Sequence, residues 1–201
     1  MLKAGVVAVQ GAVTEHLEAF ERAFSDMGRK GQAVPVRRLR DLGGVQALAI
    51  PGGESTTISR LLQKFGLFDE IGKRAREGMP VLGTCAGLVL LSREGDEEVR
   101  RTKTRLLGLV DMAVARNAFG RQKESFEADI AVDLPGEEWR RPYPAVFIRA
   151  PVVTRVWGGC RALACVEGRI VLAGQGNLVA AAFHPELTTD TRLHRLLLGM
   201  I

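Results

Sequence analysis

The five residues Gly83-Thr84-Cys85-Ala86-Gly87 constrain the fold of this chain more than any other stretch. The apolar run 79–82 before them predicts a buried strand, and the apolar run 88–91 after them predicts the start of a helix. Cys85 is therefore expected at a sharp strand-to-helix turn, which is the geometry of a nucleophile elbow. The two flanking glycines fit this interpretation, because strand and helix can approach closely only where side chains are absent.

An elbow of this kind suits a catalytic cysteine for two reasons. The positive end of the helix dipole stabilises a thiolate at Cys85. The backbone N–H of Ala86 points toward the oxyanion that forms when the thiolate attacks a carbonyl carbon. The alternative is that Cys85 is a small buried apolar residue, and the five-residue motif alone favours neither interpretation.

Composition is that of an ordinary globular protein and argues against several partners. The 201 residues are 46% apolar and 25% charged, which is enough for one substantial core. The net charge of +5 comes without a run of basic residues interleaved with aromatics, so we expect no nucleic-acid partner. No segment has the length of a membrane span, so we expect no membrane partner either.

Cysteine usage indicates the compartment. Cys85, Cys160 and Cys165 are an odd number without C-x-x-C spacing, which argues against a disulfide framework and against a zinc site. The same pattern favours a reducing compartment. The apolar run 4–9 near the N-terminus is too short for a signal peptide. We therefore expect a cytoplasmic protein with no metal site and no cofactor.

Strands and helices alternate over the first half of the chain. Apolar runs predict the strands, and amphipathic stretches of helical spacing predict the helices between them. Thr14 is in position to cap the first helix, and Pro35 predicts that the second strand lies at a sheet edge. The predicted strands cover 4–9, 32–38, 45–50 and 79–82, and the predicted helices cover 14–27, 55–65 and 68–77.

The second half of the chain is predicted to be richer in strands. The charged segment 93–105 is expected to be a solvated loop or the end of a short helix. A final amphipathic helix is predicted at 189–201, with Leu193, Leu196 and Leu197 on one face. The predicted strands cover 108–115, 126–132, 145–148, 162–166, 169–173 and 179–183.

These patterns together predict an α/β fold. The alternation of strand and helix is typical of a doubly wound sheet, and we expect a single-domain three-layer sandwich with a mixed, mostly parallel central sheet of the flavodoxin-like kind. Neither an internal repeat nor a linker interrupts the sequence, so residues 1–201 are expected to form one domain.

A catalytic cysteine needs a general base, and the chain contains only three histidines. His16 and His194 lie on predicted helices, where we expect them to be surface or capping residues. His184 follows an apolar strand, and Glu186 comes two residues later. Residues i and i+2 of an extended chain project to the same side, so Glu186 can orient the imidazole of His184. Parallel strands would bring this pair to the same sheet edge as the elbow and complete a triad.

A second strand-to-helix turn, Pro51-Gly52-Gly53-Glu54-Ser55, can complete the site. Its two glycines and the first amides of the next helix can donate N–H groups to an anion. The turn is therefore a natural second half of an oxyanion hole. An ordinary turn would account for the glycines but not for their pairing with a cysteine elbow.

The chain resembles the class I, or triad, glutamine amidotransferases at the elbow, at Pro51-Gly52-Gly53 and at His184-Pro185-Glu186. Further motifs narrow this resemblance to the glutaminase subunits of pyridoxal 5′-phosphate synthases. The motifs span almost the whole chain, and the main departures lie in segment 93–105. They are Val9-Gln10-Gly11-Ala12, residues 51–57, residues 116–122 (RNAFGRQ), residues 125–127 (SFE), residues 147–151 (FIRAP) and residues 182–188 (AFHPELT).

This resemblance implies a class I amidotransferase fold and the hydrolysis of L-glutamine to L-glutamate and ammonia. The ammonia would pass to a separate synthase subunit, a (β/α)8 barrel that builds pyridoxal 5′-phosphate, the active form of vitamin B6, from a pentose phosphate and a triose phosphate. The two subunits would form a hetero-oligomer. Cys85 would be the nucleophile, His184 the base and Glu186 the residue that orients the base.

The resemblance also assigns the remaining site residues. Gly53 and Ala86 would supply the amides of the oxyanion hole, and Gln10 would face the partner subunit. Glutamine carries an α-ammonium and an α-carboxylate, so its site needs a carboxylate and a cation. The residue types do not decide which arginine meets the carboxylate. The implied glutamine-binding residues are Gly53, Glu54, Ser55, Arg116, Ile148 and Arg149.

Three other functions compete with this one. A peptidase or deglycase on a similar fold would share the elbow but not the His-Pro-Glu element or the stretch 116–122. A class I amidotransferase subunit serving a different synthase would share the triad and differ in its partner. A catalytically inactive regulatory module would not need an intact triad.

Overall fold

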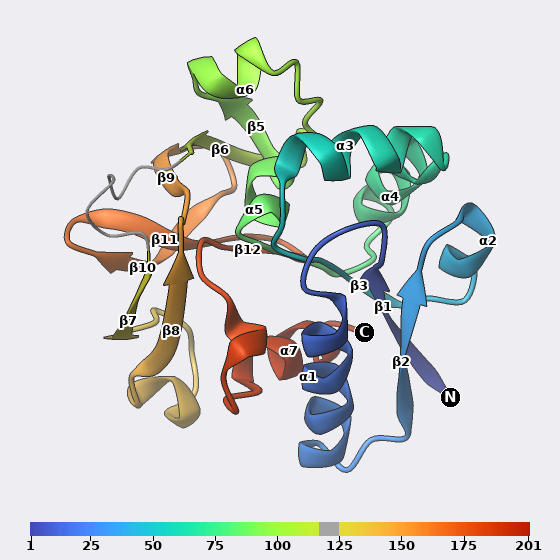
Figure 1. Cartoon of the computed structure of the whole chain (residues 1–201). Helices are drawn as coiled ribbons and strands as arrows, with labels where there is room; N and C mark the ends of the chain where they lie inside the picture. The colour runs from blue at the N-terminus through green and yellow to red at the C-terminus, as the bar shows by residue number, and fades with distance from the viewer. Residues whose placement is uncertain (117–124) are drawn as a thin grey trace.

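The computed structural model describes residues 1–116 and 125–201. Over these residues, the main sheet has ten strands in the order β2-β1-β3-β4-β12-β11-β9-β6-β5, and β10 pairs with β11 outside this path. Figure 1 shows their arrangement. The elements are β1 Leu2–Val7, α1 Val13–Asp26, β2 Gly31–Val36, α2 Leu39–Leu42, β3 Ala47–Ile50, α3 Ser55–Lys64, α4 Leu67–Arg76, β4 Val81–Thr84, α5 Ala86–Leu91, β5 Ser92–Gly95, α6 Glu97–Arg101, β6 Val110–Ala115, β7 Ser125–Ile130, η1 Glu137–Arg140, β8 Tyr143–Ile148, β9 Val152–Val156, β10 Arg161–Val166, β11 Arg169–Gln175, β12 Leu178–Ala181, η2 Pro185–Leu187 and α7 Arg192–Leu198.

One half of the main sheet is entirely parallel. Strands β2, β1, β3, β4 and β12 pair side by side in the same direction. All residues of β3 and β4 are buried, which explains why both strands are continuous apolar or small-residue runs rather than alternating ones. Pro35 lies in β2 at the edge of the sheet, as predicted, where its missing N–H costs no ladder bond.

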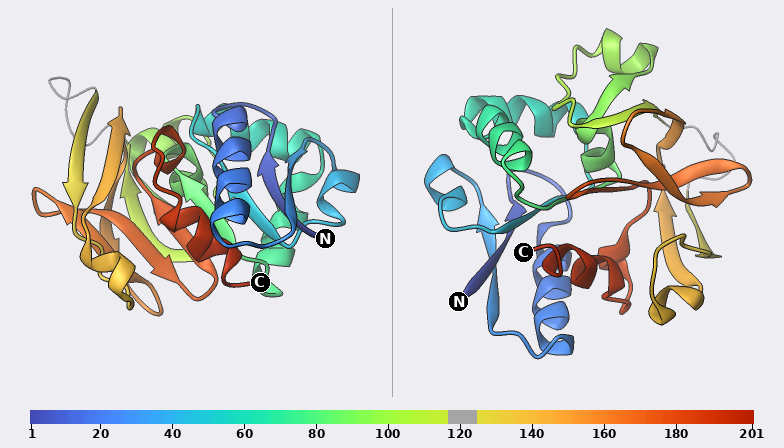
Figure 2. Two further views of the ribbon diagram at one scale, coloured as in Figure 1. Left: turned by 90° about the horizontal axis from the view of Figure 1, so that it is seen from below. Right: turned by 180° about the vertical axis from the view of Figure 1, so that it is seen from behind.

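Helices cover both faces of this parallel half. Helices α1 and α7 pack together on one face, and α3, α4 and α5 lie on the other (Figures 1 and 2). The predicted three-layer α/β sandwich with a mixed, mostly parallel sheet is therefore confirmed. Among the described residues, no helix is both long enough and apolar enough to cross a membrane.

The other half of the main sheet contains the antiparallel pairs. Strand β11 runs antiparallel to β12, β10 and β9, and β9 runs antiparallel to β6. The last pair, β6 and β5, is parallel again. Strands β7 and β8 form a separate antiparallel ribbon. This arrangement gives the mixed character that the strand-rich second half of the sequence predicted.

Three segments differ from the predictions. Segment 93–105 is not only a loop, because it contributes to the edge strand β5 and contains α6, which Asp96 caps by accepting a 2.9 Å hydrogen bond from the Val99 N–H. Strand β9 was not expected, since only its first two residues are buried. The final helix is shorter than predicted and begins at Arg192.

The predicted cap of the first helix is also wrong. Helix α1 begins at Val13, so Thr14 lies inside it, and Ala12 precedes the helix without a side-chain hydrogen bond. The backbone takes over part of this role. The Val13 N–H donates to the carbonyl of Gly11 at 2.9 Å, and the Ala12 N–H donates to the carbonyl of Gly52 at 3.2 Å.

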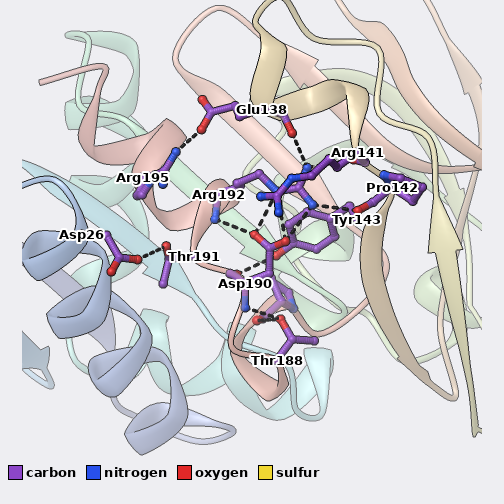
Figure 3. Close-up of polar contacts among 11 residues, drawn as sticks. Asp26, Glu138, Arg141, Pro142, Tyr143, Thr188, Asp190, Thr191, Arg192 and Arg195 are labelled. Atoms are coloured by element: carbon purple, nitrogen blue, oxygen red, sulfur yellow. Dashed lines mark hydrogen bonds and ion pairs between the residues drawn. The ribbon is translucent and has the colours of Figure 1, made fainter.

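A buried arginine ties the C-terminal helix to the segment before β8, as Figure 3 shows. The guanidinium of Arg192 donates to the carbonyls of Glu138, Arg141 and Pro142 at 2.6, 2.9 and 2.8 Å. Its Nη2 also lies 2.7 Å from Oδ2 of Asp190. These contacts fix the path of the chain into β8, the strand whose Val146 carbonyl accepts a 2.8 Å hydrogen bond from the His184 N–H.

Candidate active site

The elbow has the geometry that the sequence predicts. Cys85 joins β4 to α5 with φ 49° and ψ −101°, a backbone conformation that costs energy in a residue with a side chain. Its N–H donates to the Ala181 carbonyl at 2.8 Å, which anchors the elbow to the neighbouring strand β12. Strain of this kind persists where the surrounding structure enforces it, and it is common at nucleophiles.

Both glycines of the elbow are required because neighbouring backbone atoms lie too close to leave room for a side chain. A Cβ atom on Gly87 would lie 2.0 Å from the Ile50 carbonyl oxygen. A Cβ atom on Gly83 would lie 2.6 Å from the backbone of Gly87. No side chain fits at either position, so the glycines allow β4 and α5 to pack closely enough to expose the nucleophile.

His184 and Glu186 form a hydrogen-bonded pair. His184 Nδ1 lies 2.7 Å from Glu186 Oε1, and the carboxylate is fully buried. The pairing was predicted, but the extended chain expected for it is wrong, because Glu186 lies in the short 3-10 helix η2. Pro185 begins this turn, and the turn brings the Glu186 carboxylate back to the imidazole of His184.

Electrostatics favour a charged imidazole at His184. Burial disfavours the charge, but hydrogen bonds to Cys85 and to Glu186 outweigh it and raise the pKa of His184 to about 10. Burial also opposes ionisation of Glu186, and contacts with His16 and His184 nevertheless hold its pKa below the ordinary value. A thiolate–imidazolium pair backed by a carboxylate is the reactive form of a cysteine nucleophile.

A cavity of about 480 Å³ opens over the elbow. It brings together all the predicted site residues except Glu186, which lies behind His184. Val89, from α5, also lines it and was not expected, since its position in an apolar run carries no signal of a site. The lining residues are Gln10, Gly11, Ala12, Gly52, Gly53, Glu54, Ser55, Cys85, Ala86, Val89, Arg116, Ile148, Arg149, Pro151 and His184.

The Gly52-Gly53 turn is held by the loop after β1. The Gly52 carbonyl accepts from the Ala12 N–H, so in a trans peptide the Gly53 N–H points to the opposite side. Gly53 has φ +156°, which favours glycine. Gln10 touches the same turn, because its Oε1 accepts a 2.9 Å hydrogen bond from the Glu54 N–H.

Glu54 also caps helix α3. Its Oε1 accepts from the Thr56 N–H at 2.9 Å and its Oε2 accepts from the Thr57 N–H at 2.7 Å. Burial opposes ionisation of this carboxyl, but the bonds from Thr57 and Thr56 outweigh it and lower its pKa. Glu54 is therefore an ionised carboxylate of fixed orientation at the rim of the cavity.

Arg116 is a cation that lies beside Glu54. Its Nη2 lies 3.6 Å from Glu54 Oε1 and 3.7 Å from Glu98 Oε1. Its buried Nη1 has no hydrogen-bond partner within the described part of the chain. Arg149 follows β8 with φ 43°, so a second strained residue lies at the cavity. Residues 117–122 of the RNAFGRQ motif lie outside the described residues.

The expectation for the other two histidines is wrong. His16 and His194 are both fully buried rather than at the surface. His16 Nδ1 lies 3.0 Å from His194 Nε2, and His16 Nε2 lies 3.3 Å from Glu186 Oε2. A sequence signal for this burial existed, because His16 shares the spacing of the buried residues Phe20 and Phe24 on α1.

Over residues 1–116 and 125–201, no group of three or more His, Cys, Asp and Glu side chains is arranged to hold a metal ion. The site itself combines a cysteine, a charged histidine and a buried carboxylate beside a cavity that is lined by a fixed carboxylate and two arginines.

Comparisons with known proteins agree with this geometry. The model of the SNO glutamine amidotransferase family matches residues 6–201. The protein named pyridoxal 5′-phosphate synthase subunit PdxT from Archaeoglobus fulgidus is 50% identical over 199 residues, with 99% of this chain and 98% of that protein covered. The protein of the same name from Methanosarcina mazei is 45% identical over 200 residues, with 100% and 98% covered.

Solved structures show the same relationship. One described as a glutamine amidotransferase is 43% identical, with a TM-score of 0.85 and 98% of this chain and 97% of that chain covered. The PurLQS structure from Thermotoga maritima has a TM-score of 0.66 at 16% identity, with 98% of both chains covered, and therefore shares the fold alone.

Proposed function

Since this chain belongs to the SNO glutamine amidotransferase family, we propose that it is the glutaminase subunit of a pyridoxal 5′-phosphate synthase and hydrolyses L-glutamine to L-glutamate and ammonia. The observation that carries this proposal is similarity over the full length. Relatives with the PdxT name are 45% and 50% identical, and the match covers 98% of each of them. The cavity above the cysteine elbow agrees with that activity.

In the proposed reaction, the Cys85 thiolate attacks the side-chain amide carbon of glutamine. The N–H groups of Ala86 and Gly53 stabilise the oxyanion of the tetrahedral intermediate. The imidazolium of His184 protonates the amide nitrogen of this intermediate, the C–N bond breaks and ammonia departs, which leaves a thioester on the cysteine and a neutral imidazole. Water then gives a proton to that imidazole and attacks the thioester, which releases glutamate and regenerates the thiolate–imidazolium pair.

Glu186 stabilises the charged imidazole throughout this cycle and holds its Nε2 toward the sulfur. The 2.7 Å contact at Nδ1 supports this role, because a hydrogen bond at Nδ1 fixes both the tautomer and the plane of the ring. The raised pKa of His184 also supports it, since the ring must carry a proton when ammonia departs.

The zwitterionic end of glutamine is proposed to lie between Glu54 and Arg116. Glu54 offers a fixed negative charge for the α-ammonium. The Nη1 of Arg116, which has no hydrogen-bond partner among the residues that the structure describes, offers a donor for the α-carboxylate. Arg149 is the second candidate for the carboxylate. Gly53, Ser55 and Ile148 would contact the rest of the substrate, and all of them line the cavity.

The proposed partner is a synthase subunit that consumes the ammonia. The PdxT name of the relatives supports this partner, and Gln10 is the residue we place toward it, because Gln10 contacts the Gly52-Gly53 turn. Ammonia made in the cytoplasm would be lost as ammonium, so a glutaminase that serves biosynthesis needs a docked acceptor. No cofactor is needed for the glutaminase step.

Glutamine-dependent synthesis of pyridoxal 5′-phosphate tests the proposal. The chain is mixed with its cognate synthase subunit, a pentose phosphate and a triose phosphate, and both glutamate and pyridoxal 5′-phosphate are measured. We expect glutamine to support synthesis with the intact chain and not with Cys85→Ala. Ammonium chloride should support synthesis with either chain, because it supplies ammonia without glutamine hydrolysis. Absence of glutamate release would refute the glutaminase. Glutamate release without pyridoxal 5′-phosphate would refute the partner and favour a different synthase.

A further inference from the structure

His16 is a fully buried polar residue that the proposed mechanism does not use. It lies on α1, on the opposite side of Glu186 from His184, and is 0% exposed. Its Nε2 lies 3.0 Å from Thr84 Oγ1 and 3.3 Å from Glu186 Oε2. Its Nδ1 lies 3.0 Å from His194 Nε2. Burying an imidazole costs free energy unless these contacts are hydrogen bonds, so their direction matters.

The partners of His16 determine its tautomer. A carboxylate only accepts hydrogen bonds, so the ring nitrogen that faces Glu186 must carry the proton. Burial lowers the pKa of His16 and that of His194, and both rings are therefore neutral. A neutral His16 with its proton on Nε2 has a bare Nδ1, which accepts from His194 Nε2–H. The buried Nδ1 of His194 is then a bare nitrogen and needs no acceptor.

The carboxylate of Glu186 therefore has a histidine nitrogen near each of its two oxygens. Oε1 faces His184 Nδ1, whereas Oε2 has no hydrogen-bond partner of good geometry among the described residues and lies 3.3 Å from the Nε2 of His16. The carboxylate lies in a three-residue 3-10 helix rather than in a strand, so regular structure does little to fix its rotation. Without a donor at Oε2, the carboxylate could rotate away from the plane of the His184 ring.

The same nitrogen also reaches the nucleophile's own strand. Thr84 is the last residue of β4 and directly precedes Cys85. His16 therefore links the strand that carries the nucleophile to the turn that carries the orienting carboxylate, although these segments lie about 100 residues apart in sequence. Figure 1 shows α1 and α7, which carry His16 and His194, side by side beneath the sheet.

We propose that His16 is a positioning residue for the reaction, acting through Glu186 and Thr84 by donating its Nε2–H. This inference rests on the proposed glutaminase function, and it adds a fourth side chain to the three of the triad. His194 sets the tautomer of His16 by donating to Nδ1. The proton on Nε2 is what the role requires, and that requirement can be measured.

Two substitutions of the same residue separate positioning from packing. The amide nitrogen of His16→Gln lies near the place of Nε2 and can still donate to Glu186. The amide nitrogen of His16→Asn lies near the place of Nδ1 and cannot reach Glu186. We expect kcat to fall about 10- to 100-fold in His16→Asn, with KM changed less than about threefold, and to stay within about threefold in His16→Gln.

Phe20→Leu is the matched packing control. Phe20 is as buried as His16, lies one turn further along α1 and touches His194 edge-on rather than Glu186. This variant should lower the melting temperature without lowering kcat. The inference would be overturned if His16→Gln and His16→Asn lost kcat equally. It would also be overturned if the kcat of His16→Asn stayed within about threefold of the wild-type value. Wild-type protein that releases no glutamate would instead refute the proposed function.

A measurement on the wild-type chain tests the tautomer without any activity. The chain holds only three histidines, so ¹⁵N-labelled imidazoles can be resolved and assigned by NMR. We expect His16 to carry a proton on Nε2 and none on Nδ1 between pH 7 and 8. A proton on Nδ1 alone would leave Nε2 unable to donate and would refute the role of His16, even if every variant failed to fold.

Discussion

Mild acid should destabilise this protein through two histidines that the fold keeps neutral. His16 and His194 are fully buried and 3.0 Å apart, so neither ring can gain a proton without placing a charge in the core. Burial lowers the pKa of both rings from the ordinary value of 6.5. For His194 the lowering is large and is increased by His16 and Arg22, whereas Glu186 partly reverses it for His16.

The direction and the size of this change in the free energy of unfolding follow from the protons that the folded and unfolded chains bind. Below pH 6.5 the unfolded chain binds protons at these two positions and the folded chain does not, so the free energy of unfolding falls as the pH falls. A histidine that stays neutral when folded loses at most about 2 kcal/mol between pH 7.5 and pH 5, and two lose at most about 4 kcal/mol. His194 should contribute the larger share.

Other groups contribute little in this window. His184 has a raised pKa of about 10, so its contribution is complete below pH 6.5 and is lost only as the pH rises toward 10. The pKa values of Glu54 and Glu186 are lowered, and the stability they contribute is lost mainly below pH 4.5. The interval from pH 6.5 to 5 therefore reports on the buried histidine pair.

Urea unfolding of the isolated chain at pH 7.5, 6.5, 6.0, 5.5 and 5.0 measures the effect. His194→Gln is the matched variant, because its amide can still donate to His16 and cannot titrate. We expect the variant to lose at most about half as much stability as the wild type over the same interval, with equal m-values. A wild-type curve that is flat from pH 7.5 to 5, or a variant with the same slope, would show that the pair is not held neutral.

Three further outcomes are expected. His184→Asn should lower the rate of glutamine hydrolysis by several orders of magnitude and Glu186→Gln by less, since the base moves the proton and the carboxylate only orients it; the reverse order of initial rates would contradict these roles. Arg192→Met should lower the free energy of unfolding in urea by about 3 kcal/mol, because Asp190 and three carbonyls lose their donor. A loss below about 1 kcal/mol would mean that the contacts of Arg192 are dispensable for stability. Gly87→Ala should lower the melting temperature and the activity, because its Cβ would lie 2.0 Å from the Ile50 carbonyl oxygen. Gly72→Ala is the helical control and should be neutral or stabilising, because the nearest atom to its Cβ is the flexible end of Arg76 at 3.4 Å.

The sequence predicts those parts of the site that depend on local backbone geometry. The elbow at Cys85 requires glycines on both sides of a short strand-to-helix turn, and that requirement is visible in five consecutive residues. The pairing of His184 with Glu186 was also local, although a 3-10 turn rather than an extended strand brings the two together. Both features are decided within a few residues, so a pattern can reveal them.

What the sequence did not predict depends on distant partners. His16 was expected to be a surface or capping residue, and its burial depends on Thr84, Glu186 and His194, which come from three other segments. Thr14 was expected to cap α1. Instead, the carbonyl of Gly52, which lies in the neighbouring turn, accepts a hydrogen bond from the Ala12 N–H just before the helix. Strand β9 pairs mainly with β6, far away in the chain, and carries too few buried residues to show a period.

The position of β12 has a consequence for the order in which the protein becomes active during synthesis. This strand lies between β4 and β11, in the middle of the sheet, yet it is made long after β4. Until it emerges from the ribosome, β4 lacks the neighbour that anchors the Cys85 N–H, and neither His184 nor Glu186 exists beside the thiol. A nascent chain thus carries its cysteine as an ordinary thiol while the whole segment between β4 and β12 is made, and it gains a nucleophile only when β12 joins the sheet.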